Sequence, residues 1–259
     1  MDSHVEVERR GGVLSVVMAR PDRRNAITVA MYSALADAIE SCADDAAVRL
    51  ITIEGKGEDF TAGNDLGDFL QAMPAPGSGE DIPVWRLLRA LARNQVPLIA
   101  AVHGNAVGIG TTILFHCDFV LAEEGSRFVM PFVDLGLVPE AASSLLLPRI
   151  AGRRRAARYL LLCEPFGPDE AMEWGLVSKT VGPDALEAAL AETVAALIAK
   201  PAMALRLTQK LLRHEMSGEL LDRFELENAH FSERLQSAEV KEAITAFYEK
   251  RKPDFTGLG

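Results

Sequence analysis

A glycine-rich turn that interrupts an apolar run, at residues 98–110, constrains the fold more than any other part of this sequence. Residues 98–102 have the composition of a buried strand, and Gly104, Gly108 and Gly110 follow before a helix is expected to begin. The first turn of a helix has unpaired N–H groups with partial positive charge, and glycines let a ligand approach the backbone closely. The segment therefore predicts a cradle for negative charge.

The sequence of this turn restricts which negatively charged group it could bind. A dinucleotide-binding turn needs Gly-x-Gly-x-x-Gly, but Ile113 stands at the last position, and a P-loop needs Lys and Ser or Thr after the glycine, where Thr111 and Thr112 stand. The remaining use is an oxyanion hole, in which fixed N–H donors stabilise the charge that develops on a thioester oxygen. The alternative is a tight strand-to-helix turn that binds no ligand.

A second glycine turn lies earlier in the chain, after a strand-like run at residues 49–54. Residues 60–66 read Phe-Thr-Ala-Gly-Asn-Asp-Leu, so Gly63 again precedes the expected start of a helix. Two such turns, each after a strand, can face each other.

Together the two turns contain F-x-A-G-x-D-L and A-V-x-G-x-A-x-G-x-G, which resemble motifs of the crotonase superfamily, the enoyl-CoA hydratase/isomerase family. Segments that also follow the family's order lie at residues 116–119, 128–131, 135–139, 147–152 and 171–177. The resemblance covers nearly the whole chain. It implies an α/β fold with a crotonase-like ββα spiral core at residues 1–200 and a C-terminal helical trimerisation region at residues 201–259. It also implies a homotrimer or a hexamer.

The resemblance implies that the backbone N–H groups of Asn64 and Ile109 are the oxyanion donors. Hydratases of the family use two glutamates to hold a water and exchange its proton. This sequence has Thr112 and Phe132 at those positions, and neither side chain acts as an acid or base near neutral pH. The ordinary two-glutamate hydration mechanism is therefore not expected.

A different carboxylate, Glu140, follows Leu-Val-Pro at residues 137–139. Its position resembles that of the single glutamate in peroxisomal-type Δ3,Δ2-enoyl-CoA isomerases, which moves a proton between C2 and C4 of the acyl chain. Apolar neighbours such as Phe132 would raise its pKa toward the working range. The alternative is that Pro139 and Glu140 open a helix, where a first-turn acid is favoured whatever the function. Asp134 is the other candidate base, and Asp65 is interpreted as a helix-start cap.

Coenzyme A enters as part of the substrate, so no separate cofactor is expected. The resemblance implies that the substrate contacts a set of residues from both turns, the segment before them and the C-terminal tail: Arg24, Ala26, Ala62, Asp65, Leu66, Gly108, Phe132 and Lys250. For Lys250, a solvated basic helix end is the alternative interpretation.

The net charge and the cysteine content argue against several other classes of protein. A net charge of -10 and a pI near 5.1 argue against a nucleic-acid-binding protein. The three cysteines are too few and too scattered for a disulfide framework or a metal site, so none is expected. No signal peptide or long apolar span is visible, and we expect a cytoplasmic protein that does not bind membranes.

Local patterns indicate where helices and strands lie. A hairpin is expected at residues 5–10 and 13–18, a helix at 28–42, and mostly parallel strands at 50–53, 98–102 and 119–122. Residues 69–83 are interpreted as a mobile connection. From residue 153 the pattern is almost wholly helical, with helices at 154–163, 168–174, 183–200, 201–217, 219–236 and 238–250.

The expected function is that of an enoyl-CoA isomerase in acyl-CoA or fatty-acid breakdown. Two alternatives remain open: a hydratase-like enzyme with another acyl substrate, and a non-catalytic acyl-CoA-binding homologue. A serine hydrolase is not expected, because the sequence has no G-x-S-x-G nucleophile motif.

Overall fold

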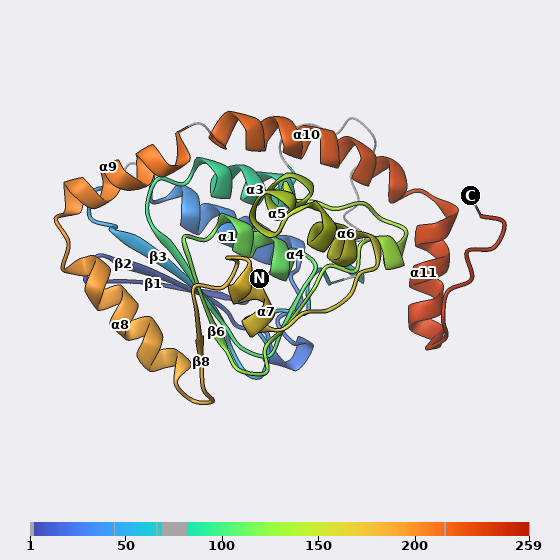
Figure 1. Cartoon of the computed structure of the whole chain (residues 1–259), viewed down its shortest axis with the longest axis horizontal. Helices are drawn as coiled ribbons and strands as arrows, with labels where there is room; N and C mark the ends of the chain where they lie inside the picture. The colour runs from blue at the N-terminus through green and yellow to red at the C-terminus, as the bar shows by residue number, and fades with distance from the viewer. Residues whose placement is uncertain (1–2, 44, 66, 69–81, 215, 259) are drawn as a thin grey trace.

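A six-stranded sheet forms the centre of the computed structural model, which describes residues 3–43, 45–65, 67–68, 82–214 and 216–258 (Figure 1). The strand order is β1-β2-β3-β4-β6-β8, in which β1 and β2 are antiparallel and every other pair is parallel. The strands are β1 (Val5–Arg10), β2 (Val13–Met18), β3 (Leu50–Gly55), β4 (Leu98–Val102), β6 (Phe119–Glu123) and β8 (Lys179–Val181). The predicted hairpin and mostly parallel pairing are confirmed.

The two faces of this sheet contact different helices because successive side chains of a strand point to opposite faces. In β4 every residue is buried, but Leu98, Ala100 and Val102 belong to the main core while Ile99 and Ala101 belong to a second cluster. Helix α8 (Leu186–Ile198) covers the second face through Ala189 and Leu190. The main core lies on the other side, under α1 (Val29–Glu40) and α3 (Pro83–Arg93), which pack against each other.

Helix α1 confirms the helix expected at residues 28–42, and the Thr28 hydroxyl caps it by accepting the Met31 N–H at 3.2 Å. The interpretation of residues 69–83 as one connection is wrong at its end. Pro83 is the first residue of α3, a position where proline is favoured because its missing N–H is not needed. Residues 69–81 lie outside the described residues.

The expectation of an almost wholly helical C-terminal part is wrong at β8, which pairs in parallel with β6 at the edge of the sheet. This strand is three residues long and only Val181 in it is buried, so it has too little apolar pattern to be recognised. The helices around it are α5 (Ser143–Ala151), α6 (Arg153–Leu161), α7 (Pro168–Glu173), α9 (Ala202–Arg213), α10 (Met216–Arg234) and α11 (Ala238–Glu249).

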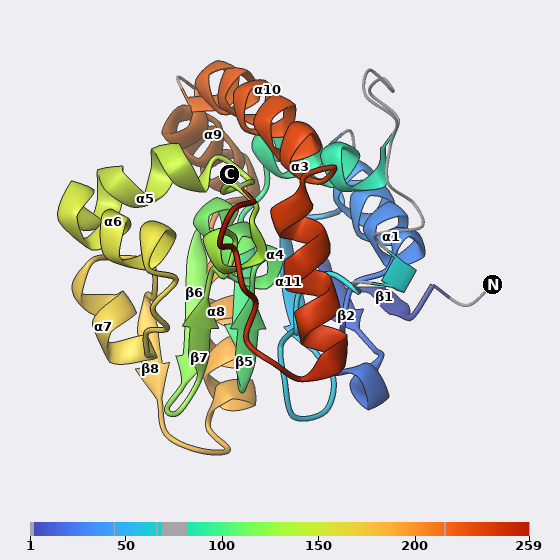
Figure 2. The same cartoon turned by 90° about the vertical axis from the view of Figure 1, so that its right-hand side faces the viewer.

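A second, two-stranded parallel sheet positions the glycine turn described first. It pairs β5 (Asn105–Val107) with β7 (Arg127–Val129), and β5 leads into the short helix α4 (Ile109–Thr112) and the 3-10 helix η2 (Ile113–His116). Two further 3-10 helices are η1 (Pro21–Arg23) and η3 (Val133–Leu135). In Figure 2, β5 and α4 lie between the layer of α5 to α7 and the layer of α1 and α3.

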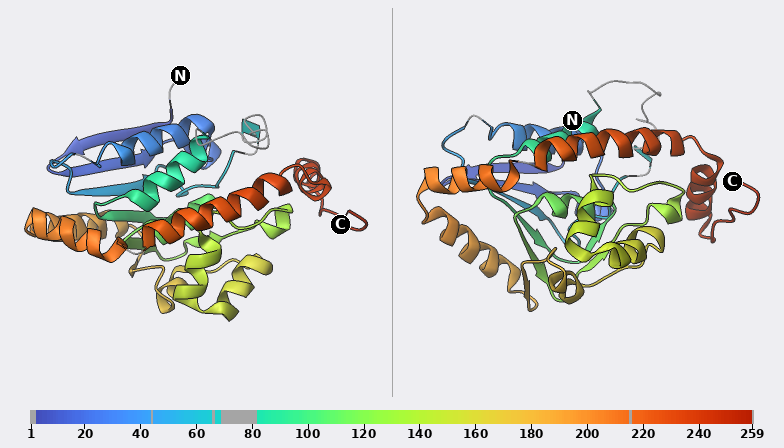
Figure 3. Two further views of the ribbon diagram at one scale, coloured as in Figure 1. Left: turned by 90° about the horizontal axis from the view of Figure 1, so that it is seen from above. Right: turned by 45° about the horizontal axis from the view of Figure 1, so that its top comes forward.

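Helices α9 and α10 run along one side of the molecule, and α11 turns away at their end (Figure 1, Figure 3). Helix α9 turns polar side chains inward: Arg206 donates to the Asp45 and Val48 carbonyls, and Gln209 donates to Asp118. Its exposed large apolar side chains are Met203, Leu207, Leu211 and Leu212. Within the described ranges no single helix has the length and hydropathy to cross a membrane, and only the pair α8 and α9, bent by 105°, passes that test together.

Candidate active site

The two glycine turns lie side by side. The Thr61 N–H donates to the Asn105 carbonyl and the Val107 N–H donates to the Thr61 carbonyl, both at 3.0 Å, so a short parallel bridge joins them. The backbones of the two turns are so close at Gly63 that a Cβ atom on this residue would lie 2.7 Å from the Val107 carbonyl oxygen. Glycine at this position therefore allows the two backbones to approach each other.

The backbone N–H groups of Asn64 and Ile109 have no acceptor in the part of the chain that the structure describes. Their neighbours are paired: the Asp65 N–H donates to the Ile27 carbonyl at 3.0 Å and the Gly108 N–H donates to the Val129 carbonyl at 2.8 Å. Each turn thus contributes one unpaired donor. The turn before Ile109 depends on Gly108, whose φ of 54° and ψ of -116° suit glycine alone.

The side chain of Ile109 does not occupy the space in front of its own N–H group. It is 1% exposed and belongs to the main hydrophobic core, so it contributes to packing while its backbone begins α4. An isoleucine at this position is therefore compatible with a backbone donor.

Glu140 is 1% exposed, and its Oε1 atom has no hydrogen-bond partner among the described residues. Burial, with a smaller contribution from the charge of Glu227, raises the pKa of Glu140 to about 8. The helix-start interpretation is wrong, because α5 begins at Ser143 and Ala142 occupies its N-cap. A buried carboxyl with a free oxygen and a pKa near neutrality can both take and return a proton.

The turn after Glu140 is held by a residue that the sequence reasoning missed, Glu227 of α10. Its carboxylate accepts the Ala142 N–H at 2.6 Å, the Ser144 N–H at 3.1 Å and the Ser144 hydroxyl. A sequence signal exists for it. The buried residues of α10 are Leu220, Phe224, Glu227 and Phe231, so Glu227 occupies an apolar position of an amphipathic helix.

Tyr32 of α1 was also missed, because it shares the apolar face of that helix. Its hydroxyl donates to the side-chain oxygen of Asn64, the residue that supplies one of the unpaired N–H groups. Burial and the nearby charge of Glu140 raise the pKa of Tyr32. Tyr32 therefore lies near both the candidate base and one candidate oxyanion donor.

The other positions considered for acid/base chemistry differ in burial. Thr112 is fully buried, and its hydroxyl donates to the Ile109 carbonyl at 3.4 Å. Phe132 is buried in the main core, whereas Asp134 is exposed on η3. Of the two candidate bases, only Glu140 is buried.

Four of the residues expected to meet coenzyme A, namely Arg24, Ala26, Ala62 and Asp65, gather around the glycine turn at residues 60–66. The Ala62 N–H donates to the Arg24 carbonyl at 2.8 Å, and the guanidinium of Arg20 donates to the Ala26 carbonyl at 3.0 Å and to Asp65 at 2.7 Å. The sequence analysis did not predict a role for Arg20. Partial burial alone would raise the pKa of Asp65, but the hydrogen bonds and the ion pair with Arg20 outweigh it and lower that pKa. Leu66 lies outside the described residues.

Lys250 ends α11 in a left-handed conformation and is exposed. Helix α11 packs against η3, and the Tyr248 hydroxyl lies 3.9 Å from the position of a Cβ atom on Gly67. The end of α11 thus lies near the glycine turn at residues 60–66, but no contact joins Lys250 to Arg24 within the described residues.

The described ranges contain no group of three or more His, Cys, Asp and Glu side chains that could hold a metal ion. Cys42, Cys117 and Cys163 are free.

Comparison with known proteins gives consistent matches over the full chain. The model of the enoyl-CoA hydratase/isomerase family matches residues 8–258. The chain is 33% identical to the 1,2-epoxyphenylacetyl-CoA isomerase of Escherichia coli K12 over 98% of its own length and 97% of the relative. It is 32% identical to the 2,3-dehydroadipyl-CoA hydratase of the same organism, with 98% and 99% covered. A crystal structure of an enoyl-CoA hydratase/isomerase from Pseudoalteromonas atlantica T6c superposes with a TM-score of 0.90 at 36% identity, covering 98% of this chain and 100% of the other. The predicted crotonase-like α/β fold is confirmed.

Proposed function

Because the chain belongs to the enoyl-CoA hydratase/isomerase family, we propose that it moves a double bond of an enoyl-CoA from Δ3 to Δ2, with Glu140 as the single proton shuttle. Enzymes of this family process acyl-CoA thioesters, and coenzyme A is part of the substrate, so the proposed reaction needs no separate cofactor.

The thioester oxygen accepts hydrogen bonds from the N–H groups of Asn64 and Ile109. The Glu140 carboxylate removes a proton from C2, and the two N–H groups stabilise the dienolate that forms. The same carboxyl group then returns its proton at C4, which leaves the double bond between C2 and C3. No other reactant is consumed.

One observation carries the proposal: Glu140 is buried with a free oxygen and a pKa raised to about 8, while the positions used by a two-glutamate hydratase hold Thr112 and Phe132. Proton transfer is most effective when the pKa of the group lies near the working pH. A carboxyl group with an ordinary pKa would take up the C2 proton less readily.

Hydration is the alternative, and the relationship to a hydratase at 32% identity favours it. Hydration requires a second group to hold the attacking water. Glu227 is the other buried carboxylate near Glu140, but both of its oxygens accept hydrogen bonds from the Ala142 and Ser144 turn. We therefore favour isomerisation over hydration.

The test uses purified protein with a 3-enoyl-CoA and a 2-enoyl-CoA, with isomerisation and hydration followed separately. We expect isomerisation of the first substrate, with a loss of about 100-fold or more in Glu140→Gln. Asp134→Asn is the matched control, because Asp134 is an exposed acid on the neighbouring 3-10 helix. Hydration without isomerisation would support the alternative, and no turnover of either substrate would support a non-catalytic acyl-CoA-binding protein.

We also propose that residues 201–259 mediate assembly into a homotrimer or a hexamer. The support is the outward apolar face of α9, on which Leu211 is 75% exposed and Met203 is 68% exposed. Apolar surface of this kind is usually covered by a partner.

A further inference from the structure

The turn that follows Glu140 has an unfavourable backbone conformation. Ala141 and Ala142 both have positive φ, 59° and 55°, in the left-handed region that non-glycine residues rarely adopt. Such a turn persists only where the surrounding structure holds it. Its direction determines where the preceding residue, Glu140, places its carboxyl group.

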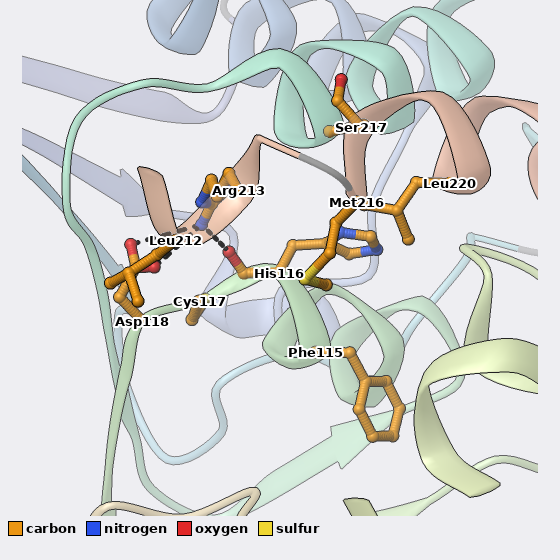
Figure 4. A pocket seen from close by; sticks show the side chains of 10 residues that line it. Phe115, His116, Cys117, Asp118, Leu212, Arg213, Met216, Ser217 and Leu220 are labelled. Atoms are coloured by element: carbon orange, nitrogen blue, oxygen red, sulfur yellow. Dashed lines mark hydrogen bonds and ion pairs between the residues drawn. The ribbon is translucent and has the colours of Figure 1, made fainter. Parts of the chain in front are cut away.

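His116 holds the carbonyl side of this turn. Its Nε2 atom lies 2.8 Å from the Ala141 carbonyl oxygen, which can only accept, so Nε2 carries the hydrogen and donates it. Burial is the main cause that lowers the pKa of His116 to about 4, so the ring is neutral at physiological pH. The ring lies against Phe224 at 5.7 Å between centroids. Figure 4 shows the bond on the other side, in which Arg213 of α9 donates to the His116 carbonyl at 2.6 Å.

Glu227 holds the N–H side of the same turn from α10. It accepts the Ala142 N–H at 2.6 Å, while the Ser144 N–H and hydroxyl donate to its other oxygen. Arg223, one turn earlier on α10, donates to the Ser144 hydroxyl at 3.2 Å. The two oxygens of Glu227 are thus fully engaged with the turn.

We propose that His116 and Glu227 are a pair of positioning residues that orient the Glu140 carboxyl group for proton transfer. This inference rests on the proposed function. The pair holds opposite sides of one strained turn, and the two residues come from separate elements. Nε2 of His116 and both carboxylate oxygens of Glu227 bond to this turn beside Glu140. Neither residue needs to touch the substrate. A shift of about 1 Å in a reacting group can reduce the rate about 100-fold.

The first test replaces the histidine donor. His116→Leu removes the N–H group, while His116→Gln keeps one at a similar reach. We expect His116→Leu to lower kcat about 10-fold to 100-fold with KM changed less than about twofold, and His116→Gln to recover most of kcat. Ser217→Ala is the control, because Ser217 lines the same 180 Å³ cavity as His116 without contacting the turn (Figure 4). Equal kcat in wild type and His116→Leu would overturn the role of His116.

The second test removes the carboxylate of Glu227. In Glu227→Gln an amide N–H₂ faces one of the N–H donors of the turn, so we expect kcat to fall about 10-fold or more. Among the described residues, the charged or titratable groups that face Glu140 and its turn are Tyr32 of α1, His116 and Glu227, with Arg223 and Arg213 behind the pair. Removing the negative charge of Glu227 also moves the apparent pKa of the rate profile downward, because that charge contributes to the raised pKa of Glu140.

Hydrogen exchange of residues 137–147, measured by mass spectrometry, tests the pair without relying on activity. We expect faster exchange in this segment for His116→Leu and Glu227→Gln, and unchanged exchange for Ser217→Ala. Unchanged exchange in all three variants would overturn the inference. Suppose that the wild type is active, Glu140→Gln is inactive, and the His116 and Glu227 variants are fully active. The proposed function would then stand, and the positioning role of His116 and Glu227 would be refuted. A wild type without isomerase activity would remove the proposed function, and the exchange result would still decide whether His116 and Glu227 hold the turn.

Discussion

Glu140→Gln should stabilise the folded protein while it lowers the proposed isomerisation about 100-fold or more. The pKa of Glu140 is raised to about 8 from its ordinary value of 4.5, so between these values the unfolded chain is ionised at this residue while the folded chain keeps its proton. The folded state then binds more protons than the unfolded state, and its stability falls as pH rises. Each pH unit in this window costs the wild type about 1.4 kcal/mol.

The expected magnitude follows from these two pKa values. Between pH 5 and pH 7 the wild type loses about 2 to 3 kcal/mol of unfolding free energy through this residue, and about 1 kcal/mol more by pH 9. Glutamine fills the same space and does not ionise, so the variant lacks this loss. The difference in unfolding free energy between variant and wild type should therefore grow by about 2 to 3 kcal/mol from pH 5 to pH 7.

Urea denaturation at pH 5, 7 and 9 measures this difference, with the fluorescence of the buried Trp85 and Trp174 as the signal. Asp134→Asn is the control, since Asp134 is exposed, and its stability should follow the wild type at every pH. If Glu140→Gln also follows the wild type at every pH, Glu140 has an ordinary pKa and the reasoning about its burial is wrong.

Three further outcomes are expected. The kcat/KM for isomerisation should rise about tenfold per pH unit below an apparent pKa near 8, because Glu140 must first lose its proton, and a flat profile from pH 6 to 9 would contradict this. Gly63→Ala places a Cβ atom 2.7 Å from the Val107 carbonyl oxygen, so it should separate the two turns and lower kcat by about 10-fold or more, while unchanged kcat would show that the turns need not be so close. Light scattering at micromolar concentration should give a trimer or hexamer for the wild type and smaller species for Leu211→Asp, whose charge falls on the exposed face of α9; a monomeric wild type would refute the assembly.

The features that could be predicted from sequence are those with strong local patterns. The hairpin around Gly11 and Gly12, the buried strand at 98–102 and the two glycine turns follow from alternation, apolar runs and glycine placement. The strand β8 was missed because three residues at a sheet edge give almost no pattern. The start of α8 was placed three residues early, since Asp184 is in a left-handed conformation that the sequence does not reveal.

In the candidate site, too, the sequence reveals some residues and hides others. Glu140 was identified from its place in a family pattern, and its burial could not be deduced from Pro139 before it, which instead suggested a helix start. Tyr32, His116 and Glu227 come from elements far apart in the chain, and each lies on an apolar face where it resembles a packing residue. Only the fold brings them close to Glu140.

The two proposed oxyanion donors belong to the main chain, which has a consequence for how this protein can change its chemistry. Replacing Asn64 or Ile109 changes a side chain and leaves the N–H group in place, provided that the new residue fits the packing. The proposed oxyanion hole is therefore robust to substitution, whereas the proposed proton transfer depends on the single carboxyl group of Glu140. A protein built in this way can acquire a different reaction on the same class of thioester by moving one acid, for example into the position of Thr112 or Phe132, without rebuilding the part that stabilises the enolate.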